Sequence, residues 1–114
     1  MLCEKTLIMA AGTGYLVKLC PPAAESDAAY TVKASRVSLV AGSECYVQFV
    51  YYDGSGTAPA APSVIFATAS DQKPAVHLAA GQPFNRGTLG QTNNPYTHLR
   101  VWAVAAGELL VDAE

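Results

Sequence analysis

The chain has 114 residues and a mass of 11.9 kDa, which is the size of one domain with its own hydrophobic core. Apolar residues make up 51% and charged residues only 14%, and the formal net charge is −2. This composition disfavours intrinsic disorder, and it disfavours nucleic-acid binding through a basic face. No run approaches the ~18 apolar residues of a membrane span. We therefore expect a single domain over residues 1–114, with neither nucleic acid nor a membrane as partner.

The first strands are expected near the N-terminus. Two short apolar runs, residues 6–10 and 15–19, lie on either side of a Gly-Thr-Gly turn at 12–14, a pattern typical of a β-hairpin. Residues 1–5 precede this hairpin, and we expect them to form an extended arm. An alternating run at 30–34 predicts a further amphipathic strand.

The middle of the chain holds the strongest predicted strand pair. Residues 37–41 and 44–53 are separated by Gly42-Ser43, which predicts a hairpin with a two-residue turn. Alternation in the second strand assigns the odd positions from 45 to 51 to the core face. Residues 53–62 are rich in Gly and Pro and predict a loop. This loop is either a solvated connection or an arm that orders on a neighbour.

The second half repeats the same kind of pattern. Strands are predicted at 63–69 and 75–79, followed by a second long loop at 82–96 that is rich in Gly and Asn. The last pair, residues 97–104 and 108–112, is predicted to form a hairpin around Ala106-Gly107.

Short strands separated by turn residues predict an all-β, single-domain antiparallel β-sandwich, jelly-roll-like and with about eight strands. The side chains expected in its core are Leu39, Val47, Phe49, Phe66, Leu99 and Val101.

The residues that carry chemistry are few and scattered. Cys3, Cys20 and Cys45 are odd in number and lack a C-x-x-C spacing, so we expect three reduced thiols, although a Cys3–Cys20 disulfide is geometrically conceivable. His77 and His98 have no second ligand or nucleophile at a useful spacing, so we interpret them as structural or surface residues. We expect no catalytic residue, no metal site and no cofactor, and we interpret the protein as not being an enzyme.

A longer pattern begins at residue 35. It consists of a strand that ends in a short polar turn, followed by Cys-Tyr-Val-Gln-Phe at 45–49. A Gly-Thr-Ala-Pro-Ala-Ala-Pro loop comes next at 56–62. Residues 99–111 then form a strand, a turn of small residues and a second strand. From residue 31 onward, this arrangement resembles small bacteriophage virion proteins of the capsid decoration, or cement, type.

The resemblance implies a viral structural protein that bridges and stabilises neighbouring subunits of the major capsid protein. It implies a location on the capsid exterior, synthesis in the host cytoplasm, and a homo-oligomer, a dimer or trimer, on the particle. Placement on the tail or portal is left open. Low charge and long loops suit a protein that acts through contact area.

Interface residues are expected mainly in the second long loop, where aromatic anchors and amides occur together. The expected interface side chains are Phe84, Arg86, Gln91, Asn93, Asn94, Tyr96 and Trp102. Phe84 and Tyr96 either anchor a partner subunit or pack over their own sandwich. Trp102 is on the outward side of its strand, where either a covering element or a subunit interface accounts for it.

Two other functions remain open. A sugar- or peptide-binding β-sandwich, of the receptor-binding tail or adhesin type, predicts a concave aromatic-lined pocket with converging polar groups. A small hydrolase requires an activated nucleophile or a carboxylate pair, and the sequence offers no motif for either.

Overall fold

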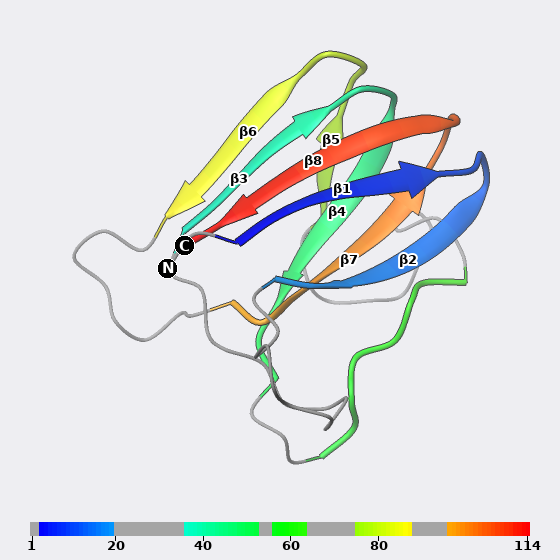
Figure 1. Ribbon diagram of the computed structural model, residues 1–114. Helices are drawn as coiled ribbons and strands as arrows, with labels where there is room; N and C mark the ends of the chain where they lie inside the picture. The colour runs from blue at the N-terminus through cyan, green and yellow to red at the C-terminus, as the bar shows by residue number, and fades with distance from the viewer. Residues whose placement is uncertain (1–2, 20–35, 53–55, 64–74, 88–95) are drawn as a thin grey trace.

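The computed structural model describes residues 3–19, 36–52, 56–63, 75–87 and 96–114. Within these ranges the chain forms eight strands and no helix. The strands are β1 (Cys3–Met9), β2 (Thr13–Lys18), β3 (Arg36–Ala41), β4 (Cys45–Val50), β5 (Val76–Leu78), β6 (Pro83–Gly87), β7 (His98–Ala103) and β8 (Gly107–Ala113). They form two antiparallel sheets that pack face to face (Figure 1). The predicted all-β sandwich is confirmed.

The strand order is that of a jelly roll. Sheet A has the order β1-β8-β3-β6, and sheet B has the order β2-β7-β4-β5. The first strand therefore pairs with the last, the second with the seventh, and so on inward to β4 with β5. The topology is that of one long antiparallel hairpin folded over on itself. The β3–β8 pairing then joins the strand pairs β1–β8 and β3–β6 into sheet A, and the β4–β7 pairing joins β2–β7 and β4–β5 into sheet B.

The three predicted hairpins are wrong, although the turns themselves are correctly placed. The short connections after β1, β3 and β7 each lead from one sheet to the other, and Figure 1 shows all the short connections at one end of the sandwich. The N–H of Gly12 donates to the Ala103 carbonyl, and the N–H of Gly42 donates to the Glu108 carbonyl, each at 2.7 Å. These turns are thus bonded to strands distant in the sequence.

Two segments expected to be arms or loops are strands in part. Residues 3–5 belong to β1, where Cys3 pairs with Ala113. Residues 83–87 form β6, an edge strand paired with β3. An edge strand tolerates Pro83, because only one side of it must donate to the ladder. Residues 56–62 of the first predicted loop have no regular secondary structure. The predicted strand at 30–34 lies outside the described residues, as does the predicted strand at 63–69 apart from Ser63, which is not in a strand.

The core lies between the two sheets and contains most of the expected side chains. Leu39, Val47, Leu99 and Val101 are each fully buried. Phe49 is partly buried against them, and Phe66 lies outside the described residues.

Tyr51 was expected on the core face, but 45% of it is exposed. The reason is that β4 ends at Val50, so the alternation of the strand does not reach Tyr51.

The cysteines differ from one another. Cys45 is a free thiol on the core side of β4, and burial together with the charge of Glu44 raises its pKa to about 11. Cys3 is disulfide-bonded, so the expectation of three reduced thiols is wrong. An odd count requires only one free thiol. The partner of Cys3 lies outside the described residues, as does Cys20.

Candidate functional site

Three of the predicted interface residues gather in one aromatic cluster. The ring of Phe49 on β4 lies 6.0 Å from that of Phe84 and 5.3 Å from that of Tyr96, between centroids. The guanidinium of Arg86 lies over the Phe49 ring, 4.7 Å from its centroid, a cation–π contact. Phe84 and Tyr96 are partly buried against the core. Both rings therefore pack on their own sandwich, and their contact with a partner subunit stays a prediction.

The other predicted interface residues lie elsewhere. Trp102 is on the outer face of sheet B, where its register partners are Gly14 and Tyr46. It is half-buried and does not join the aromatic cluster. Gln91, Asn93 and Asn94 lie outside the described residues.

The outer face of sheet B carries buried polar side chains. Gln48 on β4 and Arg100 on β7 are register partners, and only 1% of Gln48 is exposed. Nη1 of Arg100 donates to Oε1 of Gln48 at 2.7 Å, and Nε of Arg100 donates to the carbonyl of Ala60 at 2.9 Å. The segment 56–63 therefore lies over this face and is hydrogen-bonded to it.

A glycine lets this segment approach the sheet. A Cβ on Gly14 would overlap the carbonyl oxygen of Pro62, and Pro62 is buried. The backbone of 56–63 thus sits directly on β2, where any larger residue would push it away.

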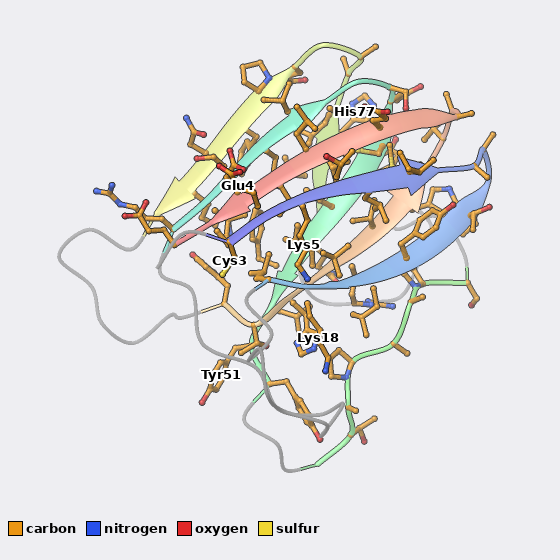
Figure 2. All side chains as sticks on the ribbon, viewed as in Figure 1. Cys3, Glu4, Lys5, Lys18, Tyr51 and His77 are labelled. Atoms are coloured by element: carbon orange, nitrogen blue, oxygen red, sulfur yellow. The ribbon has the colours of Figure 1, made fainter. Side chains whose placement is uncertain are left out.

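A polar pocket remains between the segment and the sheet. It has a volume of about 230 Å³, and its lining residues are Gln48, Val50, Tyr51, Tyr52, Thr57, Pro59, Ala60 and Arg100. Figure 2 shows Tyr51 projecting away from the sheets, at the opposite end of the sandwich from the short turns. None of these residues was predicted as a site residue. A pair of tyrosines before a Gly-rich loop was the available signal.

His98 is linked through Thr97 to Tyr52, which lines the pocket. Its Nδ1 lies 2.8 Å from Oγ1 of Thr97, and that oxygen accepts the N–H of Tyr52 at 2.9 Å. His98 is only 2% exposed, and burial, together with the charges of Lys18 and Lys5, lowers its pKa. It is a buried structural residue, as expected.

His77 is a surface residue on the same sheet. Its Nε2 lies 2.7 Å from a carboxylate oxygen of Glu44, and its ring stacks on that of Tyr46, 4.7 Å between centroids. Figure 2 places it near the end of the sandwich that holds the short turns. The pair is exposed, and it does not include a serine, threonine or cysteine.

The outer face of sheet A is open and partly apolar. Ile8, Val40 and Leu110 are exposed by 66%, 43% and 44%. Val40 and Leu110 are register partners, while Ile8 pairs with Glu108. We call Ile8, Val40 and Leu110 the sheet A patch. Its surroundings are mainly acidic: Glu4 and Asp112 are also register partners and are exposed on this face, where Arg36 at the start of β3 is an exposed basic residue.

Within the described ranges, no group of three or more His, Cys, Asp or Glu side chains is placed to hold a metal ion. The same ranges contain no helix long and apolar enough to cross a membrane. Comparison with protein-family models, with curated proteins and with solved structures finds no match. A functional assignment therefore rests on the fold and on the geometry of the two outer faces.

Proposed function

We propose that the protein is a non-enzymatic virion structural protein of the capsid decoration type, which binds neighbouring major capsid protein subunits on the capsid exterior. The sheet A patch carries this proposal. Large apolar side chains on an open sheet face mark a contact surface more often than scattered exposed residues do. Ile8, Val40 and Leu110 lie on three adjacent strands, so a flat partner surface reaches all of them.

The chemistry of the patch defines its partner. Full burial of an aliphatic side chain contributes about 1.5–3 kcal/mol, so three half-exposed side chains give a weak contact. Acidic residues around the patch, including Glu4, Glu108 and Asp112, favour a partner surface with basic residues at its edge. Attachment as a homo-oligomer to a repeated lattice multiplies such weak contacts.

Two further observations support a place on the virion. Jelly rolls recur in viral capsid domains and in lectins, which is support by analogy of fold alone. The disulfide of Cys3 suits an oxidising setting, such as the surface of a virion outside the cell. Because Phe84 and Tyr96 pack against their own core, we assign the contact to the sheet A patch in preference to the segment 82–96.

The test is attachment to purified particles of the parent phage. We expect the double variant Ile8→Gln, Leu110→Gln to keep its fold and to bind particles at least about tenfold more weakly, because both side chains are exposed and only the apolar contact is lost. Tyr51→Ala is the matched control, since Tyr51 is as exposed as Leu110 but lies away from the patch. Unchanged occupancy of the double variant, or no binding of the wild-type chain to particles, contradicts the proposal.

The sugar- or peptide-binding alternative also has a specific observation in its favour, the polar pocket on sheet B. It involves different residues from the sheet A patch, so the two functions can be tested separately.

A further inference from the structure

We propose that the pocket between segment 56–63 and sheet B binds one ring of a saccharide. This inference does not depend on capsid attachment, because the pocket and the sheet A patch lie on opposite outer faces of the sandwich. It rests on the construction of the pocket, its size, and the chemistry of its lining.

The pocket floor is a fixed polar network. Gln48 is almost completely buried, and Arg100 is held between the Gln48 side chain and the Ala60 carbonyl. Side chains held in place by such a network are pre-organised to bind, because little rotamer freedom is lost when a ligand arrives.

The volume limits the ligand to a small one. The pocket volume is about 230 Å³. Drug-sized ligands occupy pockets of about 300–1,000 Å³. One sugar ring fits this space, whereas a folded peptide does not.

The lining matches the groups of a sugar. The guanidinium of Arg100 and the hydroxyl groups of Thr57, Tyr51 and Tyr52 line the pocket beside the buried amide of Gln48, and each hydroxyl can both donate and accept a hydrogen bond. A ring that carries several hydroxyls satisfies such a set. An apolar ligand would strip water from these groups without replacing its hydrogen bonds. The ring of Tyr51, the more exposed of the two tyrosines, provides a flat surface for the C–H face of the sugar.

The neighbouring row of sheet B extends the site. Tyr46 and Trp102 are register partners, and Tyr46 also pairs with His77. They lie two residues along their strands from Gln48 and Arg100, so their side chains are on the same face at about 7 Å. We therefore expect a disaccharide to bind more tightly than its monosaccharide, with its second ring on this aromatic row.

The experiment is titration of the isotope-labelled protein, followed by NMR. The probes are glucose, galactose, N-acetylglucosamine and glucuronate, each with a matching disaccharide. We expect at least one probe to shift the side-chain resonances of Arg100 and Gln48, with a Kd of about 1 mM for a monosaccharide. Glucuronate separates recognition of a carboxylate from recognition of hydroxyls, because the neutral sugars lack the acid group.

Two variants connect the binding to the pocket. Tyr51→Ala should weaken binding about tenfold through the lost ring surface, and Thr57→Val should weaken it through the lost hydroxyl. Both residues are exposed, so the fold is expected to survive. Leu110→Ala, on the opposite face and equally exposed, is the matched control and should bind normally.

Three results overturn the proposal. They are no shift of pocket resonances with any saccharide, undiminished binding in Tyr51→Ala, and shifts caused by short peptides but by none of the sugars. Loss of capsid attachment is tested with Ile8→Gln, Leu110→Gln, whereas loss of saccharide binding is tested with Tyr51→Ala and Thr57→Val. Failure here therefore leaves the capsid proposal standing, and the reverse also holds.

Discussion

The two outer faces of the sandwich are both formed by alternate residues of their strands, but one face exposes apolar side chains and the other buries polar ones. The face of sheet A leaves Ile8 and Leu110 exposed to solvent, whereas that of sheet B buries Gln48 and His98. Exposed apolar and buried polar groups are the two informative departures from ordinary burial, and here each sheet shows one of them. Part of the difference comes from segment 56–63, which lies against β2 and is hydrogen-bonded to Arg100, and Tyr52 packs against His98.

The largest expected changes in unfolding free energy come from core variants, and they test whether sheets A and B differ only on their outer faces. Leu39 of sheet A and Leu99 of sheet B are both fully buried, so Leu39→Ala and Leu99→Ala should each cost about 2–5 kcal/mol of unfolding free energy. Leu110→Ala, on the open face, should change it by no more than about 0.5 kcal/mol. Urea unfolding measures all three. A cost for Leu110→Ala close to that of the core variants means that a second copy covers the sheet A patch.

An intermediate effect is expected where segment 56–63 rests on sheet B. Gly14→Ala places a Cβ against the Pro62 carbonyl and should destabilise the fold by about 1–3 kcal/mol through overpacking. Trp102 is the only tryptophan and the register partner of Gly14, so its emission should shift to the red as the segment moves away.

Ser38→Thr is the control for Gly14→Ala, because it adds a methyl group to the open face of sheet A. If both variants leave stability and Trp102 emission unchanged, the segment is not seated on β2 and the contrast between the two faces is lost.

The smallest expected effect is a pH dependence of the unfolding free energy, which we attribute to His98 of sheet B. Burial lowers the pKa of His98 below its ordinary 6.5, so above that pH the histidine is neutral in both the folded and the unfolded chain. Below it the unfolded chain binds the proton first, and stability falls as the pH falls toward the lowered pKa. Unfolding free energies measured between pH 7.5 and 5.0 should show this loss.

Two variants assign that loss to a residue. His98→Gln should flatten the dependence, whatever it does to stability at neutral pH. His77→Gln removes the exposed histidine of the same sheet and serves as the control. A dependence that disappears in His77→Gln but persists in His98→Gln contradicts the assignment.

Strand positions were largely predictable, because period-two alternation is strong where one face of a strand is fully buried. Val101 and Leu99 in β7 show this, as do Leu109 and Val111 in β8. Pairing was not predictable. A hairpin and a connection between sheets both need two amphipathic strands around a short polar turn. What separates them here is the hydrogen bond from Gly42 to Glu108, two residues far apart in the sequence.

The pocket was beyond prediction for a related reason. Gln48 and Arg100 become neighbours only through the β4–β7 register, and Ala60 lies in a segment without periodicity. Likewise, the contacts of Phe84 and Tyr96 with Phe49 could not be read from the sequence, because these residues are far apart along the chain. The chemical types of these residues could be read from the sequence, but their partners could not.

The rolled-up pairing also sets the order in which the chain can fold. β8 lies between β1 and β3 in sheet A, and β7 lies between β2 and β4 in sheet B. As a ribosome produces the chain, the early strands of each sheet must wait for the central strand that joins them. Loop closure over such distances makes folding slow, on the order of milliseconds to seconds. Until β7 and β8 are made, β1 and β2 remain unpaired strands, and a chaperone or a neighbouring chain can bind their exposed edges.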